Sequence, residues 1–596
     1  MADYTAPIRD HLFILEQLCG ADSASLPPEW GEFTFHDAEA VLTEAGRFAS
    51  EVLSPLNRVG DREGCRLTED GVTTPPGFRD AYRAFQENGW CAASAPKEFG
   101  GQGLPHVISS QLREIWNGAN MAFALCPLLT ESAVTLLSGH ANREQKKIWL
   151  PKLVSGEWTA AMAITEPQAG SDIGAATCRA EPDGDRYRLF GQKIFISWGD
   201  HDMTENIVHL VLARTPGAPS GSKGLSLFLS PKFLPDGARN DFRAARLEEK
   251  LGLHGSPTCE MLYGENDGAV AWLIGEEGRG LAVLFSMMNA ARLAVGDQGI
   301  GIAERALQDA RNYAAEREQG RSRQFPPGDG ARSTIDHHPD IDRSILNAGG
   351  RITAMRLMAA EVARMRDMAE AEEDEGKRKK LETRISLLTP VVKAWCTDEA
   401  VSIASESLQI YGGAGYIEET GAAQYYRDAR ILPIYEGTNG IQAIDLVFRR
   451  ILPDKGAVLM SLMDDLEIVN AKSAELAGGN VTTELKDALQ DGLYMLEESM
   501  KFILELGHDA DKEYAATPFL KQLAGAYGAC LCLRAHAKAR IDEQNAPAGG
   551  HVFESEIKRR TQYFLGIRAW DWKLTNGQVY YALIAGGMAR KHDFPA

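Results

Sequence analysis

The chain has 596 residues and a formal net charge of −20, from 83 acidic and 63 basic side chains. Its length corresponds to roughly three to five domains, and the acidic balance argues against a nucleic-acid-binding protein, which needs basic side chains to meet the phosphates. The nine cysteines are scattered without a C-x-x-C pair, so neither a disulfide scaffold nor a metal site is predicted, and a reducing compartment is favoured.

The N-terminus carries Asp3 and Asp10 and lacks a long apolar run, which argues against a signal or transit peptide. Because no apolar stretch of about 18 residues is found, no membrane span is expected, and the default location is the cytoplasm. Residues 1–158 are predicted to form a helical domain, since apolar residues recur at helical spacing within 37–54 and 77–89.

The character of the sequence changes in residues 159–276. Short runs of β-branched and aromatic residues occur there, for example at 187–190, 207–212 and 225–229, with glycine and proline turns between them. This pattern is typical of an antiparallel β domain.

Long amphipathic runs return at 277–452 and predict a C-terminal four-helix bundle. Residues 453–596 also look helical, with breaks at 478–480 and 545–550, and from residue 451 onward the chain carries 16 Lys and Arg against 20 Asp and Glu. The predicted fold class is therefore α+β and multi-domain: an N-terminal helical domain, a middle antiparallel β domain, a C-terminal four-helix bundle and an additional C-terminal helical domain.

Two motifs mark the predicted β domain. Residues 163–175 (AITEPQAGSDIGA) gather small and hydroxyl side chains on a strand-to-loop turn, which could offer backbone N–H groups and hydroxyls to a heteroatom-rich ring or a phosphate. In residues 191–199 (GQKIFISWG), an aromatic and a hydroxyl side chain alternate on a strand. Taken singly, the first is equally an ordinary β-turn, and the second equally places Phe and Trp in a core.

Two further motifs lie in the helical half. The glycine-rich run 409–416 (QIYGGAGY) could let the backbone approach a pyrophosphate or an adenine closely, or could simply end a helix. The fourth motif joins 427–430 (RDAR) to 435–442 (YEGTNGIQ), where Glu436 stands at a loop-to-helix junction. A lone glutamate at such a junction is usually a helix N-terminal charge.

In their order and spacing the four motifs resemble those of the acyl-CoA dehydrogenase family, over roughly residues 35 to 450. The resemblance implies an FAD-dependent oxidoreductase that removes an α-proton and a β-hydride from an acyl-CoA thioester, with Glu436 as the catalytic base. One branch of the family places its glutamate immediately before a bundle arginine, but here Ala291 precedes the matching Arg292. Gln424 stands where the family has Lys or Arg, which we interpret as a lost surface contact.

The resemblance also implies the binding residues, with FAD lying between the β domain and the bundle. The FAD-binding residues would be Met162, Ile164, Thr165, Gly170, Ser171, Phe195, Ile196, Ser197, Arg317, Gln409, Gly412, Gly413, Thr438 and Asn439. Arg317 would pair with the pyrophosphate of the neighbouring subunit's FAD, because a guanidinium fork suits phosphate. Ser171, Arg292 and Gly437 would contact the substrate. The acyl tail would end near 121–130, where Phe123, Leu125 and Leu128 either limit its length or pack in the core.

The runs 4–15, 250–259 and 316–325 resemble a bacterial branch that includes 3-methylmercaptopropionyl-CoA dehydrogenase. This implies formation of methylthioacryloyl-CoA during dimethylsulfoniopropionate breakdown, with electron-transferring flavoprotein and a second copy of the chain as partners, in a homodimer or a dimer of dimers. A straight-chain acyl-CoA dehydrogenase and an acyl-CoA oxidase stay open as alternatives. A flavin-containing DNA-binding protein of the alkylation-response type also stays open, although the C-terminal charge balance disfavours it.

Overall fold

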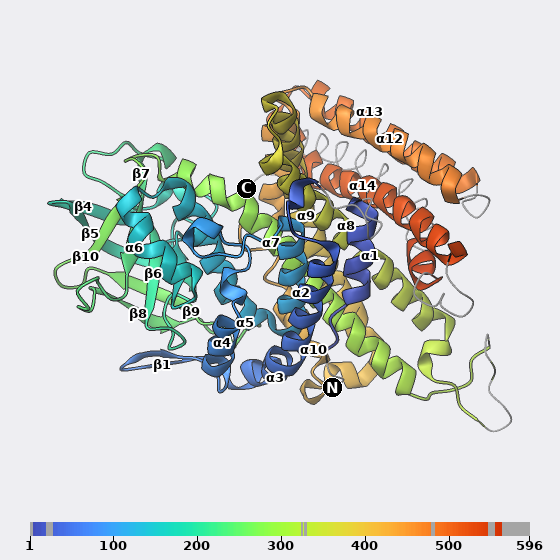
Figure 1. Ribbon diagram of the computed structural model, residues 1–596, viewed down its shortest axis with the longest axis horizontal. Coiled ribbons are helices and arrows are strands. Elements are labelled where there is room, and N and C mark those ends of the chain that lie inside the picture. Colours follow the sequence, from blue (N-terminus) through green and yellow to red (C-terminus); the bar gives the residue numbers. More distant parts are fainter. Residues whose placement is uncertain are drawn as a thin grey trace, which may run out of the picture. The chain divides into compact units, whose positions relative to one another are not determined.

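The computed structural model describes residues 4–19, 28–323, 326, 331–477, 483–545, 555–562 and 565 (Figure 1). The chain forms two compact units. The N-terminal unit comprises Asp3–Ala6 and Thr43–Ala294, and the C-terminal unit comprises Met1–Ala2, Pro7–Leu42 and Val295–Ala596. The helix break predicted at 478–480 lies outside the described residues, as do residues 546–550 of the break predicted at 545–550.

The first part of the chain is helical, as the sequence predicts. Its helices are α1 (Ile8–Cys19), α2 (Phe35–Phe48), a π-helical turn (Ala49–Leu53), α3 (Ser54–Glu63), α4 (Phe78–Glu87), α5 (His106–His140) and α6 (Arg143–Val154). A short hairpin, β1 (Arg66–Thr68) with β2 (Gly71–Thr73), follows α3. Helix α6 begins with a capping box, in which Asn142 and Gln145 each bond the other's backbone N–H.

Helix α5 is interrupted at Asn120, whose backbone has left the helical region (φ −159°, ψ 90°). The Asn120 side chain accepts a hydrogen bond from the Phe123 N–H and donates one to the Leu53 carbonyl, so it caps the second half of α5. By length and composition α5 could cross a membrane, but 72% of its most apolar 18-residue window is buried inside the protein. Such burial is typical of a core helix.

The middle of the chain forms an eight-stranded sheet. Its strands are β3 (Trp158–Ala163), β4 (Arg179–Asp183), β5 (Arg186–Ser197), β6 (Asn206–Arg214), β7 (Leu225–Pro231), β8 (Phe242–Leu247), β9 (Thr258–Tyr263) and β10 (Ala269–Ile274). Most neighbours are antiparallel, but β3 pairs in parallel with β6, and β4 joins β6 through one parallel pair. The prediction of a purely antiparallel domain is therefore wrong at β6, because parallel pairing joins strands distant in sequence and leaves no local turn signal.

Strand β6 shows why the sheet is stable. All its residues except Arg214 are buried. Successive side chains point to opposite faces of the sheet, and each face is covered by a core. Val208, Leu210 and Leu212 pack in a core that includes α5 and α6, whereas Ile207 and Val211 pack in a second core with β5 and β9. Because β10 pairs with both β7 and β5, the strands close on themselves around that second core.

The second half is helical again, which confirms the helix–sheet–helix order. Its helices are α7 (Gly280–Glu316), α8 (Pro339–Ala371), α9 (Glu375–Ile410), α10 (Ala422–Ala429), α11 (Asn439–Asp445), a π-helical turn (Leu446–Ile451), α12 (Ala457–Ala477), α13 (Thr483–Glu505) and α14 (Asp509–Asn545). Helices α8 and α9 pack along each other, and α14 packs against α8, α9, α11 and α12 (Figure 1). The C-terminal extension thus covers the bundle.

Ion pairs connect α1 and Arg560 of the C-terminal extension to α7 and α8. Asp10 of α1 lies 3.3 Å from Arg356 of α8 and 3.0 Å from Arg560, and Arg356 also bonds Glu304 of α7 at 2.9 Å. Burial opposes ionisation of Glu304, but the surrounding arginines, Arg356 above all, lower its pKa to about 2. The extension is therefore fixed to the bundle by charge as well as by apolar packing.

Candidate active site

The part of the fourth sequence motif around Glu436 lies in a loop of residues 430–438, between α10 and α11. Glu436 is half-buried there, and its backbone has the left-handed conformation (φ 55°), followed by Gly437 at φ 86°. A non-glycine residue in this region costs on the order of 1–3 kcal/mol and persists only where its surroundings fix it. Thr438 ends the loop as the N-cap of α11, with its hydroxyl accepting a hydrogen bond from the Ile441 N–H.

Side chains from three helices fix this loop. Lys393 of α9 donates hydrogen bonds of 2.9 Å to the carbonyl oxygens of Leu432 and Gly437. Gln442 of α11, fully buried, donates to the Glu436 carbonyl at 3.4 Å and to the Gly437 carbonyl at 3.3 Å. The Tyr435 hydroxyl donates to the buried side chain of Gln298 on α7. Glu436 thus lies in a segment held both before and after it.

Tyr435, the residue before Glu436, is held in its neutral form. Burial raises the pKa of Tyr435 well above the usual value, and the adjacent Glu436 carboxylate raises it further. Tyr435 therefore acts as a hydrogen-bond donor and carries no negative charge at neutral pH.

Asn439, which the resemblance assigns to FAD, already has structural partners. Its amide donates to the Asp398 carboxylate at 2.7 Å and to the Ala394 carbonyl at 3.0 Å. Its side-chain oxygen accepts from Lys393 at 2.9 Å and from Thr397 at 3.3 Å. A contact between Asn439 and a cofactor would therefore have to come from its backbone.

The first two sequence motifs lie side by side in the N-terminal unit. Glu166 and Ala169 exchange backbone hydrogen bonds, so the first motif is a tight turn, and the Ile194 N–H donates to the Thr165 carbonyl at 2.9 Å. The buried Lys193 donates to the Ile164 carbonyl at 3.0 Å and to Glu166 at 2.8 Å. These bonds place the 164–171 turn next to the 194–197 strand end.

A β-bulge explains why Phe195 is presented to the outside. The register of β5 against β9 shifts between Lys193 and Ile196, and a bulge re-aims the side chains within it. Phe195 takes φ 60° and is 59% exposed, whereas Ile196 is buried in the core at 1%. Of these predicted flavin neighbours, Phe195 offers an accessible ring, and Ile196 could contribute only backbone.

The remaining predicted residues of this turn are accessible. Met162, Ile164, Thr165 and Ser197 are partly exposed, and Gly170 and Ser171 are exposed. Hydroxyl groups, backbone and one aromatic ring are therefore available on neighbouring segments. This set of groups suits a flat, heteroatom-rich ring.

In the C-terminal unit, the third motif is the end of α9. Tyr411 is the helix C-cap and Gly412 follows at φ 59°, so the alternative interpretation of a glycine helix end is confirmed. Gln409, Gly412 and Gly413 are all exposed. Tyr411 stacks on Tyr313 with 4.3 Å between ring centroids, which brings the end of α7 next to this turn.

Arg317 follows the end of α7 and is exposed. Its carbonyl accepts from the Ile335 N–H at 2.8 Å, and Gln319 and Ser333 are paired in the same way at 2.9 Å. The insertion after Arg317 is therefore a loop whose two ends are hydrogen-bonded to each other. Residues 324–325 and 327–330 of that insertion lie outside the described part of the chain.

Two polar residues are more buried than the sequence suggests. Gln424 is 2% exposed and donates to Asp428 of the same helix at 3.3 Å, so its interpretation as a lost surface contact is wrong. The helix turns this position inward, where an amide bonded to a carboxylate is tolerated. Arg292 of α7 is 3% exposed and is therefore buried as well.

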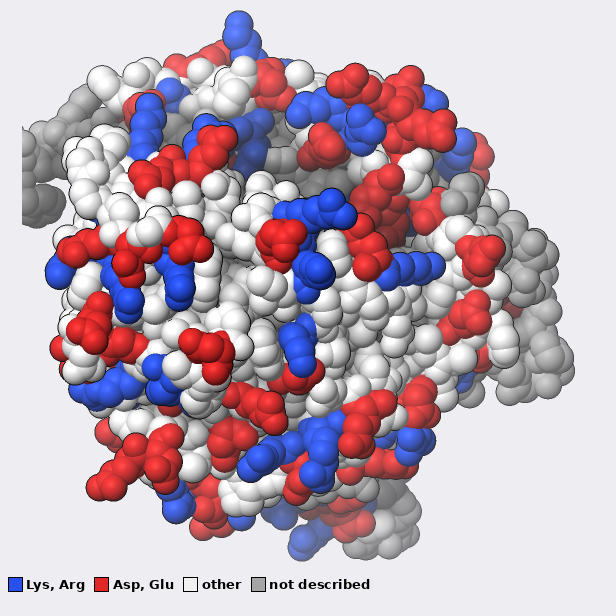
Figure 2. All heavy atoms as spheres, turned by 60° about the vertical axis from the view of Figure 1, so that its left-hand side comes forward, with Lys and Arg blue, Asp and Glu red and all other residues white. Residues whose placement is uncertain are grey.

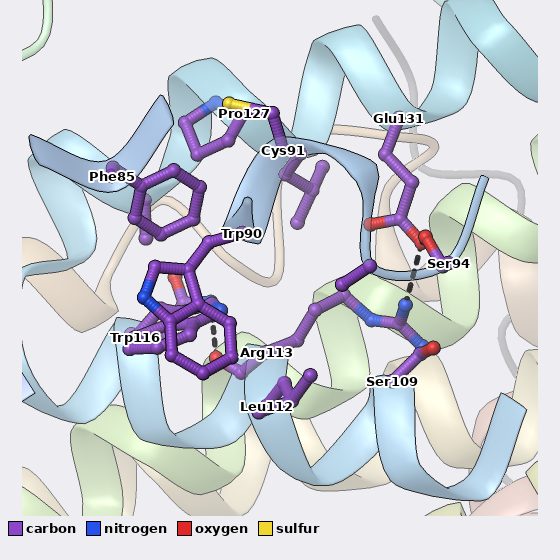
Figure 3. Close-up of a pocket in the computed structure, with 14 residues that line it drawn as sticks. Phe85, Trp90, Cys91, Ser94, Ser109, Leu112, Arg113, Trp116, Pro127 and Glu131 are labelled. Carbon is purple, nitrogen blue, oxygen red and sulfur yellow. Dashed lines mark hydrogen bonds and ion pairs between the residues drawn. The ribbon is translucent and has the colours of Figure 1, made fainter. Parts of the chain in front are cut away.

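A small cavity lies within the N-terminal unit (Figure 3). It offers about 40 Å³ to the centres of water-sized molecules. Its lining residues are Phe85, Trp90, Cys91, Ala93, Ser94, Ser109, Leu112, Arg113, Trp116, Asn117, Ala124, Pro127, Leu128 and Glu131. Leu128, expected to limit the acyl tail, is among them, whereas Phe123 and Leu125 are buried and are not part of this lining.

The cavity has an aromatic end and a charged end (Figure 3). Phe85 and Trp90 each pack edge-on against Trp116, with ring centroids 5.3 Å and 5.1 Å away. On the other side Arg113 donates to Glu131 at 2.9 Å, and the Ser94 hydroxyl donates to the same carboxylate oxygen at 2.8 Å. A group bound in the cavity would therefore contact aromatic side chains on one side and a hydrogen-bonded ion pair on the other.

Sequence reasoning missed the buried lysines and their acceptors. Lys393 stands in the otherwise apolar run 391–395 (VVKAW), and Lys193 directly precedes the apolar run 194–196 (IFI) of β5. Since lysine is almost never fully buried unless it is paired, a lysine inside an apolar pattern is the signal that could have identified both.

Three family models match the chain in succession. They describe the N-terminal domain (residues 36–157), the middle domain (161–265) and the C-terminal domain (278–452) of acyl-CoA dehydrogenases. The chain is 43% identical over 529 residues to 3-methylmercaptopropionyl-CoA dehydrogenase of Ruegeria pomeroyi, covering 87% of this chain and 88% of that protein. It is 35% identical over 480 residues to a broad-specificity linear acyl-CoA dehydrogenase of Mycobacterium tuberculosis, covering 78% of each.

A solved structure is similar over nearly the whole chain. It is an acyl-CoA dehydrogenase complexed with FAD from Bacillus anthracis, with a TM-score of 0.74, 21% identity, and coverage of 96% of this chain and 92% of that one. At this identity the likeness supports the fold, with its helical N- and C-terminal domains and its β middle domain.

Proposed function

The chain belongs to the acyl-CoA dehydrogenase family, and from this premise we propose that it oxidises 3-methylmercaptopropionyl-CoA to methylthioacryloyl-CoA, with Glu436 as the base. The observation that carries the proposal is the strained backbone of Glu436 in a loop held from α7, α9 and α11. Strain of this kind is retained where a fixed geometry is part of the chemistry.

FAD is the cofactor of the family. The exposed groups fit it: the Phe195 ring, the Thr165, Ser171 and Ser197 hydroxyls, and the Arg317 guanidinium for a pyrophosphate. When bound, FAD supplies the acceptor for the hydride that leaves Cβ. The charge of Arg317 is well suited to phosphate in a chain whose net charge is −20.

The protein's own part is to remove the proton. The Glu436 carboxylate takes the α-proton, the Cα–H electron pair becomes the new C=C bond, and the hydride leaves Cβ in the same transformation. Glu436 is partly buried, and proton transfer to a carboxylate base benefits from a site that excludes water. We propose that Gly437 and Ser171 contact the thioester and that the buried Arg292 orders the substrate region.

The cavity supports a short acyl tail. A single water needs about 10–15 Å³ of such space, so about 40 Å³ has room for only a few heavy atoms. The rings of Phe85, Trp90 and Trp116 suit a thioether, because sulfur contacts aromatic edges favourably. We propose that the methylthio end of the substrate lies here.

The anaerobic reaction of the purified holoenzyme tests the function. It is mixed with 3-methylmercaptopropionyl-CoA and with straight-chain acyl-CoAs of increasing length, while flavin absorbance near about 450 nm is followed. Fast bleaching by the methylthio ester and its short analogues is the expected result. Preferential bleaching by long chains would favour a straight-chain enzyme, as in the mycobacterial relative, and rapid reoxidation by O₂ alone would favour an oxidase.

We propose electron-transferring flavoprotein as the electron acceptor, assembly as a homodimer or a dimer of dimers, and residence in the cytoplasm. On the face in Figure 2, basic side chains alternate with acidic ones, and a DNA-binding alkylation-response function would instead favour a continuous basic surface. A gel shift with duplex DNA at physiological salt is expected to show no binding.

A further inference from the structure

Lys393 lies at the centre of the loop that carries Glu436. Its ammonium donates hydrogen bonds of 2.9 Å to the Leu432 carbonyl, the Gly437 carbonyl and the Asn439 side-chain oxygen. These acceptors precede and follow Glu436 in the chain. One side chain of α9 therefore joins both ends of the loop across the proposed base.

The burial of Lys393 makes this arrangement stiff. The side chain is among the largest fully buried ones, at 0% exposure, and a buried ammonium is tolerated only when it is hydrogen-bonded. A protonated lysine has three donors, and the three acceptors match them in number. Movement of the loop would break bonds that water could not replace.

The loop itself needs such a constraint. Glu436 and Gly437 both have positive φ, and the segment between α10 and α11 consists of turns and bends. Gln442 donates to the Glu436 and Gly437 carbonyls, of which Lys393 binds only that of Gly437, but Gln442 comes from the helix that the loop leads into. Lys393 ties the loop to a separate helix, α9, and so fixes its position in the bundle.

We propose that Lys393 is a positioning residue for the reaction: it acts through Glu436, holding the carboxylate where it meets the α-proton of the CoA thioester. The proposal rests on the proposed function, because it requires Glu436 to be the base. Displacement of a reacting group by about 1 Å can cost on the order of 100-fold in rate. Loss of Lys393 should accordingly slow the chemical step, while the proposed substrate-binding residues Ser171 and Arg292, which belong to the N-terminal unit, should stay in place.

The test uses the holoenzyme carrying Lys393→Met, which keeps the length of the side chain and removes its donors. Anaerobic flavin reduction is measured against acyl-CoA concentration, giving a limiting rate and a Kd. We expect the limiting rate to fall by about 10- to 100-fold and the Kd to stay within about threefold. Lys379→Met is the matched control, since Lys379 is on the same helix with its side chain 75% exposed, and it should react like the wild type.

A double variant separates positioning from general damage. If Lys393 acts through Glu436, adding Lys393→Met to Glu436→Gln should not slow the residual reaction further, because no base is left to position. A full additional loss of 10-fold or more in the double variant, or a single variant within about twofold of wild type, overturns the proposal.

Two other outcomes are also decisive. Should Lys393→Met fail to retain FAD, Lys393→Gln, which keeps two donors, is measured in its place. If neither variant retains FAD, Lys393 supports the fold and the positioning role is wrong. If no acyl-CoA bleaches the wild-type flavin, the proposed function fails, whereas a reactive wild type with an equally reactive Lys393→Met refutes the role of Lys393 alone.

Discussion

The Lys193 ammonium lies 2.8 Å from a Glu166 carboxylate oxygen, with the two side chains 0% and 2% exposed. Glu166 also accepts hydrogen bonds from the backbone N–H groups of Thr177 and Cys178, at 2.7 Å and 3.0 Å. This pair holds the turn that we propose to face the flavin ring. It is the counterpart, in the N-terminal unit, of the lysine that holds the Glu436 loop in the C-terminal unit.

Removing the Lys193 charge should destabilise the N-terminal unit and loosen FAD. Lys193→Met leaves a buried carboxylate without its cation, which typically costs about 3–5 kcal/mol. Thermal unfolding and the FAD content after gel filtration measure the two effects. Lys223→Met, at an exposed position of the same unit, should change neither, and an unaltered melting temperature in Lys193→Met would contradict this account.

The same pair predicts acid sensitivity. Burial opposes ionisation of Glu166, but Lys193 and the backbone hydrogen bonds outweigh it and lower its pKa to about 2. A carboxylate with a lowered pKa stabilises the fold above its usual value of 4.5 and loses that contribution as pH falls towards 2. Glu166→Gln should therefore differ most from wild type in unfolding free energy above pH 5, and the difference should shrink below pH 4.

Replacing Glu436 by glutamine should abolish turnover without disturbing binding. Glu436→Gln keeps the size and hydrogen-bonding capacity of the side chain and removes its basicity, so flavin reduction should slow by at least about 1,000-fold. FAD content and the Kd for a CoA thioester should stay near the wild-type values. A flavin reduction rate close to that of wild type would exclude Glu436 as the base.

The order of elements was predictable because it rests on periodicity. The runs at 187–190, 207–212 and 225–229 all lie in strands, and the loop-to-helix junction predicted at Glu436 leads into α11. Parallel pairing of β3 with β6 was not predictable, since a parallel neighbour leaves no turn between the two strands.

The surroundings of the candidate site residues were not predictable from the sequence. Phe195 and Ile196 are adjacent in sequence, yet a bulge exposes one and buries the other. Gln424 was expected at the surface and is buried, because the face that a short helix turns inward depends on its tertiary neighbours. The partners of Lys193 and Lys393 are 27 and more residues away in sequence, so no local pattern indicates them.

Arg317→Ala should weaken FAD retention. The exposed guanidinium follows α7 at the base of a hydrogen-bonded loop, where it is available to a pyrophosphate. The flavin-to-protein absorbance ratio after dialysis measures the loss. Arg343→Ala on the neighbouring helix α8, where Arg343 pairs with Asp340 at the surface, is the matched control. Equal flavin content in the two variants would show that Arg317 does not bind FAD.

Changes at Leu128 should alter the preferred acyl length. Leu128→Ala enlarges the cavity and should raise the relative rate with longer straight chains, while Leu128→Phe fills it and should restrict the enzyme to shorter ones. Truncating a buried leucine also costs about 2–5 kcal/mol of stability. Leu136→Ala, buried on the same helix but outside the cavity lining, controls for this cost. Leu136→Ala should lower the melting temperature without changing the chain-length profile. If Leu128→Ala also kept the wild-type chain-length profile, the acyl tail would lie elsewhere.

The contact between His254 and Asp61 predicts a loss of stability at alkaline pH. The ring nitrogen Nδ1 of His254 lies 3.1 Å from the Asp61 carboxylate, and this hydrogen bond raises the pKa of His254 to about 9. A histidine whose pKa is raised stabilises the folded protein fully below its usual value of 6.5, and the contribution disappears as pH rises through about 9. The melting temperature of His254→Gln should therefore lie below that of wild type at pH 6 and approach it above pH 9. Asp61→Asn should remove the same pH dependence, because the raised pKa depends on the carboxylate, and a constant gap between wild type and His254→Gln from pH 6 to 10 would show that the pair carries no charge-dependent stability.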